Sequence, residues 1–331
     1  MTEILRVDQP GLGVITDMGR CAPHLGQSRN GALDQASARL ANALVSNSLD
    51  DAVIELVAMD SVFTVLSDCV VAITGATSTV TIDGRHHLTG EPLFVRSGEQ
   101  LAITDIRDGM RVYLAVLGSF DVQRVLGSCA PDAYVGIGRG LQLGQVLGSG
   151  ESLSVITPPK RPFIRIAAPS QAVHASQAKV EVTPGPQYDD FSSSLDAFYG
   201  SSYTVSAQSD HVGLRLRGYI PERASTAEIL SAGTPIGAIE VTPGDELLAL
   251  HRGRGVTAGY PIIAIATSRG LDILAQASPM AEVAFSLVDT AIAIAQRRAD
   301  HSRLLHIRAR AAAALAAHGV DCPMNSMKAT P

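Results

Sequence analysis

Residues 62–82 read VFTVLSDCVVAITGATSTVTI, and this stretch decides the fold class. β-Branched and aliphatic residues gather in short runs at Val62–Leu66, Val70–Thr74 and Thr79–Ile82, with small and polar residues between them. Such runs favour strands, because branched side chains pack well on a pleated surface. An Asp-Gly pair follows at 83–84, and glycine accepts the positive φ of a tight hairpin turn. The stretch therefore predicts short strands joined by tight turns.

The same pattern continues downstream. Leu101–Thr104 and Val112–Leu117 complete a first group of predicted strands, and a Ser97-Gly98 pair precedes them as a second hairpin-type turn. Thirty glycines and seventeen prolines punctuate the chain, which is typical of many short strands with tight connections. We expect a mainly β protein built as a barrel or a sandwich.

A second group of strands is predicted in the other half of the chain: Phe163–Ile166, Lys179–Val182, Tyr203–Val205, Leu214–Arg217, Ala238–Val241, Leu247–Leu250 and Ile262–Ala266. Residues 157–162 read TPPKRP, and proline lacks the amide donor that a central strand needs. We place a linker there. The predicted domains are residues 1–157, residues 163–286, and a helix with a tail over residues 287–331.

Few helices interrupt the strands. From Asp34 to Val45 apolar residues recur at helical spacing, and Asp34 stands where an N-cap should. Asp189–Tyr199 is a second candidate. Val288–Ala317 is rich in alanine, arginine and isoleucine, has no proline or glycine, and ends before Gly319. A long carboxy-terminal helix is therefore predicted.

Composition and charge exclude several classes of protein. Hydrophobic residues are 46% and charged residues 18%, so the chain is expected to fold. The formal net charge of −6 repels phosphate backbones and anionic lipids, so we expect no nucleic-acid partner and no membrane partner. The apolar stretch Leu271–Ile294 is broken by Asp272, Pro279 and two further acidic residues, which argues against a membrane span. Any anion site must be local.

The cysteines and histidines indicate neither a metal site nor a disulfide framework. Cysteines 21, 69, 129 and 322 have no short spacing, which argues against a zinc cluster or a redox pair and favours a reducing compartment. The nine histidines are dispersed, so no metal is expected. The first residues carry no basic segment followed by an apolar run, and we expect a cytoplasmic protein.

The usual catalytic signatures are missing, including G-x-S-x-G, H-E-x-x-H and the Walker loop. The loop before the first predicted helix is more informative, since a loop that feeds a helix start can hold an anion on free amides. The alternative is that Asp17 pairs with Arg20 across a turn and that Asp34 only caps its helix. Arg215, on an otherwise apolar strand, is either a clamp for a carboxylate or phosphate or a solvent-facing residue.

Short motifs occur in a fixed order along residues 4–286: PGL at 10–12, D-x-G-R at 17–20, GA-x-D at 31–34, LAN at 40–42, Asn47, YLAV at 113–116, LGS at 126–128, PGPQ at 184–187, SD at 209–210, G-x-RL at 213–216, S-x-G at 231–233, GAI at 237–239 and GYP at 259–261. This ordered series resembles the allophanate hydrolase subunit 2 family, which includes the C-subunit of ATP-dependent 5-oxoprolinase.

The resemblance implies a fold of two cyclophilin-like β-barrel subdomains. It also implies a carboxyltransferase-like subunit of a heteromeric ATP-dependent enzyme that processes a small amide or lactam, as 5-oxoprolinase or a urea or allophanate amidolyase does. The implied partner is a protein similar to allophanate hydrolase subunit 1 or to the B-subunit of 5-oxoprolinase. No cofactor is expected to bind this chain directly, while ATP, and biotin where the reaction uses it, enter through partner subunits.

The resemblance further implies a pocket in which arginines, hydroxyls and carboxylates bind a small amide or carboxylate and stabilise developing charge. Residues that match family positions are expected to be catalytic, namely Asp17, Arg20, Arg254, Thr257 and Tyr260. The expected substrate-binding residues are Asp34, Arg215, His211 and Glu240. We expect the three arginines to converge on one hollow that faces a second polypeptide.

The chain departs from the family pattern in this pocket. Thr16 stands where the family has glutamine, His211 replaces an arginine, and Glu240 replaces a glutamine. In the GRGVTAGYP segment at 253–261, an acid, an amide and a hydroxyl of the family pattern have also changed. The changes indicate a different substrate or, as the alternative function, a non-catalytic regulatory or structural subunit with a degenerate pocket.

Overall fold

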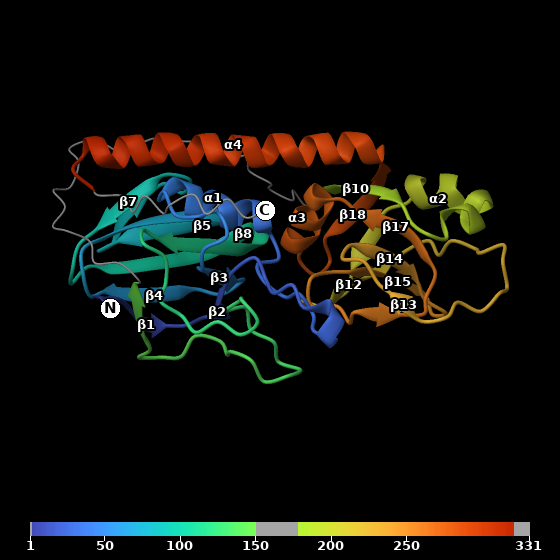
Figure 1. Cartoon of the computed structure of the whole chain (residues 1–331), viewed down its shortest axis with the longest axis horizontal. Helices are drawn as coiled ribbons and strands as arrows, with labels where there is room; N and C mark the ends of the chain where they lie inside the picture. Colours follow the sequence, from blue (N-terminus) through green and yellow to red (C-terminus); the bar gives the residue numbers. More distant parts are fainter. Residues whose placement is uncertain (1, 150–177, 321–331) are drawn as a thin grey trace.

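Two large sheets lie side by side beneath one long helix in the computed structural model, which describes residues 2–149 and 178–320 (Figure 1). The first is an open, curled sheet and the second is a closed barrel. The predicted class, mainly β with few helices and a long carboxy-terminal helix, is confirmed.

The open sheet has nine strands, all paired antiparallel, and its main path runs β2-β3-β8-β4-β1-β9. Off this path, β5 pairs with β8, and β6 and β7 pair with β5. Its strands are β1 (Thr2–Gln9), β2 (Gly13–Thr16), β3 (Val53–Val57), β4 (Ser61–Val65), β5 (Cys69–Ile82), β6 (Arg85–His87), β7 (Pro92–Val95), β8 (Gln100–Val116) and β9 (Val146–Ser149). The sheet does not close into a barrel, because the main path ends at β2 and at β9. The barrel-like subdomain expected for the first half of the chain is therefore a curled half-barrel.

The two longest strands of the open sheet each join runs that the sequence pattern separates. β5 and β8 pair along most of their length, with register shifts on both sides of Thr77. Gly75 has a φ of +101°, and a Cβ there would lie 2.3 Å from the carbonyl oxygen of Arg111. These bulges bend the strands without ending them. Ser97-Gly98 also differs from the expectation, since the strands on either side of it, β7 and β8, do not pair with each other.

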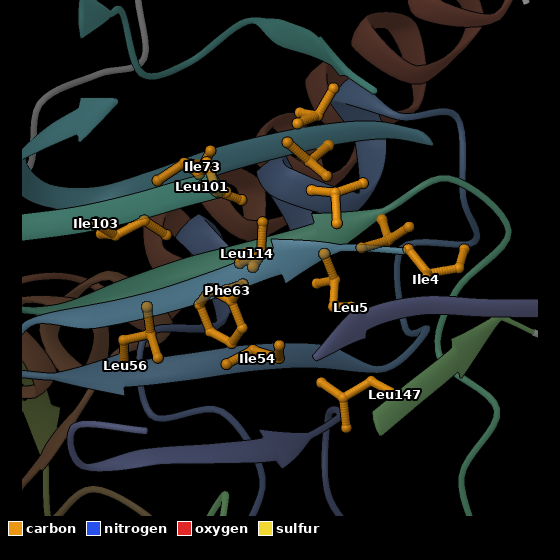
Figure 2. Packing of buried hydrophobic residues seen from close by; sticks show 14 of the residues in the cluster. Ile4, Leu5, Ile54, Leu56, Phe63, Ile73, Leu101, Ile103, Leu114 and Leu147 are labelled. Atoms are coloured by element: carbon orange, nitrogen blue, oxygen red, sulfur yellow. The ribbon is translucent and has the colours of Figure 1, made fainter. Parts of the chain in front are cut away.

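The concave side of the open sheet encloses a core of aliphatic side chains around Phe63. Figure 2 shows Leu5, Ile54, Leu114 and Leu147 pointing into this core from different strands. Leu5, Ile54 and Phe63 are fully buried. At roughly 1.5–3 kcal/mol for each fully buried side chain, this core is the main source of stability for the sheet.

The barrel closes in the order β10-β17-β14-β15-β12-β11-β18, and its one parallel pair joins β10 to β18. Its strands are β10 (Ala178–Pro184), β11 (Tyr203–Val205), β12 (Gly213–Arg217), β14 (Ala238–Val241), β15 (Glu246–Leu250), β17 (Ile262–Ala266) and β18 (Glu282–Leu287), and a separate ribbon pairs β13 (Ala232–Gly233) with β16 (Thr257–Ala258). Alternation places residues such as Leu214, Leu216 and Ile239 inside the barrel, where they pack around Tyr203 and Phe285.

The shorter helices cover the sheets. α1 (Gln35–Leu44) packs on β5 and β8 of the open sheet, and α3 (Ser268–Gln276) packs on β10 of the barrel and also touches β8. The predicted helix at 189–199 is a 3₁₀ segment, η2 (Tyr188–Ser194), followed by α2 (Leu195–Gly200). A further 3₁₀ turn, η1, covers Pro23–Leu25. α3 was not expected from the sequence.

The long helix α4 (Thr290–Ala317) runs over both sheets (Figure 1). It begins at Asp289, whose carboxylate accepts hydrogen bonds from the amides of Ala291 and Ile292, and it ends before Gly319 at φ +74°. Ile307, Ala311 and Leu315 are its buried residues, and Ile307 and Leu315 join the cluster that packs α1 on the outer face of the open sheet. The helix therefore docks through its second half.

Some predictions lie outside the described residues: the linker at 157–162, the strand Phe163–Ile166, Cys322 and the tail after residue 320. Among the described helices, none combines the length and hydropathy needed to cross a membrane.

Candidate functional site

The open sheet and the barrel meet at the loop that joins β2 to α1. In this loop the amide of Asn30 donates to the carbonyl oxygen of Arg252 at 2.8 Å, and Ser28 Oγ donates to that of Arg254 at 2.8 Å. We call residues 17–35, the barrel segment 251–254, and the side chains that contact them the junction. It brings together residues more than 200 positions apart, so sequence spacing gives no sign of it.

Residues 17–35 and 251–254 contain four arginines: Arg20, Arg29, Arg252 and Arg254. Arg20 is only 1% exposed. Its Nη2 donates to the carbonyl oxygen of Ala130 and its Nη1 lies 3.8 Å from Asp132 Oδ2, but Nε and Nη1 have no hydrogen bond among the described residues. A buried guanidinium with uncommitted N–H groups is a strong donor for an anion.

The other guanidinium groups repel one another. Burial, followed by repulsion from Arg29, lowers the pKa of Arg254, and burial lowers the pKa of Arg252 to about 10 although Asp272 opposes the shift. Arg254 Nε donates to the carbonyl oxygen of Thr234, which holds the side chain against the β13–β16 ribbon. The resulting excess of positive charge favours a carboxylate or phosphoryl group.

Asp17 lies at the junction, and both of its carboxylate oxygens accept hydrogen bonds from other residues of the chain. Its Oδ1 accepts from the amide of Gly19 and from Ser128 Oγ, and its Oδ2 accepts from the amide of Cys129 and from Arg124 at 2.8 Å. The expected pairing of Asp17 with Arg20 is wrong, because the segment at 124–129 folds over Asp17 and Arg20 turns toward Asp132.

The amino terminus of α1 is already occupied by carboxyl groups of the chain itself. Asp34 caps the helix, as predicted, and accepts from the amide of Ser37 at 2.9 Å. Asp272 Oδ1 accepts from the amides of Gln35 and Ala36 at 2.9 and 3.4 Å. The expectation that these amides hold an external anion is therefore wrong, since a carboxyl group from α3 occupies them. Burial raises the pKa of Asp272 to about 8.

A buried hydrogen-bond chain continues from Asp34 into the open sheet. The Tyr113 hydroxyl donates to Glu55 Oε2 at 2.7 Å and accepts from the amide of Asp34 at 2.8 Å. Gln276 Nε2 donates to Asp34 Oδ2 at 2.7 Å. Burial, the largest cause, and the nearby Glu55 and Asp34 carboxylates raise the pKa of Tyr113 well above its usual value. Tyr113 thus acts as a neutral hydrogen-bond relay.

His251 is fully buried at the barrel side of the junction and was not predicted. Its Nδ1 accepts from the amide of Arg252, so the proton lies on Nε2 and is donated to the carbonyl oxygen of Leu271 at 3.0 Å. Burial and the Arg252 charge lower the pKa of His251 well below its usual value. The imidazole is neutral and ties the arginine segment to α3.

Three predicted residues border the junction. His211 is exposed, and its carbonyl oxygen accepts from the amide of Gly253, where a Cβ would lie 2.4 Å from His211 Cδ2. Thr257 is exposed on the β13–β16 ribbon. Tyr260 lies just after this ribbon and is 44% exposed. Thr257 and Tyr260 follow Arg254 in the segment between β15 and β17, so one barrel loop presents all three residues.

The structure does not bring Arg215 into this group. Arg215 lies on the outer face of β12, about half exposed, and its Nη1 is 3.3 Å from Glu246 Oε2. Glu240 shares this outer face, since both residues are opposite Leu248 of β15. It is 1% exposed, its Oε1 has no hydrogen bond among the described residues, and burial raises its pKa to about 7.

The comparisons with known proteins agree with this architecture. Residues 25–287 match the family model described as carboxyltransferase domain, subdomain A and B. The chain is 35% identical to the C-subunit of 5-oxoprolinase of Escherichia coli over 252 residues, which cover 76% of this chain and 80% of that one. It is 31% identical to urea amidolyase of Saccharomyces cerevisiae over 60% of this chain and 11% of that one.

The solved structure of urea amidolyase from Kluyveromyces lactis superposes with a TM-score of 0.82 and 25% identity, over 93% of this chain and 20% of that chain. The chain therefore spans about a fifth of that larger protein. With most of its length matched by one family model, the chain belongs to the family of carboxyltransferase domains built from subdomains A and B.

Proposed function

We propose that the chain is the carboxyltransferase-like subunit of a heteromeric, ATP-dependent enzyme that processes a small amide or lactam such as 5-oxoproline or a urea-type amide. The name of its bacterial relative, the C-subunit of 5-oxoprolinase, supports the existence of further subunits. The partner that completes the enzyme is a protein similar to allophanate hydrolase subunit 1 or to the B-subunit of 5-oxoprolinase. ATP, and biotin where the reaction uses it, are bound by partner subunits, and no residue of this chain is assigned to them.

The arginine cluster of the junction carries this proposal. Processing of an amide or lactam develops negative charge on a carbonyl or phosphoryl oxygen, and preorganised cationic donors stabilise such charge. Arg20 has buried N–H groups without hydrogen bonds, and Arg254 lies on the loop that also presents Thr257 and Tyr260. In the proposed enzyme Arg254 contacts the anionic group, while Arg20 holds the segment around Ala130 and Asp132 in place.

The test is coexpression with a subunit 1 relative, followed by ATP-dependent assays on 5-oxoproline and urea. Replacing Arg254 by Gln is expected to lower kcat by roughly 100-fold or more, the usual effect of losing one charge-stabilising donor. Arg215→Gln is the matched control, since Arg215 pairs with Glu246 on the outer barrel face and its loss is expected to leave kcat unchanged. Both variants must still assemble with the partner, as measured by size-exclusion chromatography.

One observation favours the second candidate, a regulatory or structural subunit. Asp17, Asp34 and the amides of α1 find their hydrogen-bond partners within the chain, which is what a site without a substrate needs. An assembled complex inert on both substrates, or one whose function is unchanged by Arg254→Gln, would favour this candidate over the enzyme.

A further inference from the structure

A cavity of about 480 Å³ lies under α4, and none of the predicted site residues is among its described lining residues. α4 covers it, and the remaining walls come from α1, α3 and β10, so both halves of the molecule contribute (Figure 1). Its volume falls within the range of about 300–1,000 Å³ that is usual for small-molecule sites.

The interior of the cavity is aliphatic. Leu40 of α1, Ile273 of α3, and Leu304 and Ile307 of α4 line it from three helices, and none of its described lining residues is aromatic. The Arg269–Asp300 pair, with two N–O distances of 2.8 and 2.9 Å, connects α3 to α4 across it. An aliphatic chain fits these walls better than a planar ring does, because an aromatic ligand would find no aromatic side chain among the described lining residues to stack on.

Three cations, Lys179, Arg269 and Arg303, and three carboxyl groups, Glu181, Asp272 and Asp300, line the cavity. Arg269 is balanced by Asp300, and Glu181 also acts on Arg269, since both carboxylates raise its pKa. Lys179 and Arg303 line the cavity as exposed residues, so they border its opening, and neither side chain has an ion pair or hydrogen bond among the described residues. These two cations favour an anionic group at the opening.

Asp272 does not compete for these two cations. Its Oδ1 is bound by the amides of Gln35 and Ala36, and burial raises its pKa to about 8, so its carboxyl group is largely neutral at pH 7. The cavity thus combines an aliphatic interior with unpartnered cations at its mouth.

We propose that this cavity binds an amphipathic monocarboxylate, with the aliphatic chain between α1, α3 and α4 and the carboxylate at Lys179 and Arg303. One carboxylate can pair with these two cations, and the head-and-chain arrangement matches the separation of charged rim from apolar wall. The site is separate from the junction arginines, so it does not depend on the proposed function.

Isothermal titration calorimetry of the full chain with decanoate, decan-1-ol and acetate tests the proposal. Decanoate is expected to bind one site per chain, at least tenfold more tightly than decan-1-ol, which lacks the charge, and than acetate, which lacks the chain. The double variant Lys179→Gln with Arg303→Gln is expected to lose that tenfold preference for the carboxylate. Arg310→Gln, at an exposed position on α4 outside the cavity lining, is expected to bind as the wild type does.

A second pair of variants tests the location. Leu304→Trp fills the cavity from α4 and is expected to abolish binding, while Leu305→Trp, at the neighbouring residue with 44% exposure, is expected to preserve it. Ile273→Phe fills the cavity from α3 and gives a second test if Leu304→Trp disturbs α4. Absence of decanoate binding, equal binding of decan-1-ol, or unchanged binding in both filled variants would overturn the proposal.

Discussion

At the scale of single residues, Glu240 combines near-complete burial with a carboxylate oxygen that has no hydrogen bond among the described residues. Burial raises its pKa from 4.5 to about 7. Because the folded pKa is the higher one, the unfolded chain gives up the proton first as the pH rises. The free energy of unfolding is therefore expected to fall from about pH 4.5 through about pH 7 on account of this group.

Glu240→Gln is expected to remove that part of the pH dependence and to be more stable than the wild type at pH 8 by about 1–3 kcal/mol, because glutamine buries no charge and one pKa unit corresponds to about 1.4 kcal/mol. Urea denaturation at pH 5 and pH 8, followed by circular dichroism, measures the difference. Glu228→Gln, at an exposed position, is the control and should follow the wild type at both pH values. Equal pH dependence in Glu240→Gln and the wild type would contradict the assignment.

At the scale of elements, α4 has buried residues on its second half and exposed apolar residues, such as Ile292 and Ile294, on its first turns. Leu315 is fully buried in the cluster with α1. Leu315→Ala is expected to destabilise the protein by about 2–5 kcal/mol, because it removes buried methyl groups and leaves a void. Thermal or urea unfolding measures this loss.

Leu305→Ala, on the same helix but 44% exposed, is the matched control and is expected to change stability by less than about 0.5 kcal/mol. Similar effects of the two substitutions would mean that α4 is not docked through its second half.

At the scale of the whole molecule, Gln276 connects α3 of the barrel side to the open sheet. Its Oε1 accepts from the amides of Met110 and Arg111, each at 2.9 Å, and its Nε2 donates to Asp34 and to the carbonyl oxygen of Arg111. Gln276→Ala leaves the amides of Met110 and Arg111 without this acceptor, at about 1–3 kcal/mol each. We expect the two halves to unfold less cooperatively in this variant.

Hydrogen exchange measured by mass spectrometry is the readout, with faster exchange expected at residues 100–116 and 268–276. Gln187→Ala removes a comparable hydrogen bond, from the amide of Ile262, but within the barrel side alone. Its effect should stay local, and a similar loss of cooperativity in both variants would argue against a coupling role for Gln276.

The strands were largely predictable because local pattern and burial agree. Tyr203–Val205, Ala238–Val241 and Ile262–Ala266 have the predicted bounds, since branched residues and flanking turn residues mark both ends. α3 was missed because its nine residues are short for a helix and read as part of an apolar stretch. β5 and β8 were each divided in two, because bulges that only their mutual pairing stabilises resemble turns in the sequence.

The candidate site was predictable only in part. Asp34 was correctly predicted as a helix cap, because capping depends on residues three positions apart. Arg29, Arg252, Asp132 and Asp272 were missed, because nothing in their local sequence distinguishes them from surface charges. Their significance comes from contacts between the loop after β2 and the barrel.

The sequence by itself determined the β class, most strands, the cap of α1 and the long helix α4, since each follows from propensities and periodicities within a few residues. Tertiary structure alone decided that one sheet closes and the other stays open. It also decided that Arg124 pairs with Asp17, and that Asp272 occupies the amides of α1. Those outcomes depend on burial and charge shared between segments up to 237 residues apart, which no local pattern contains.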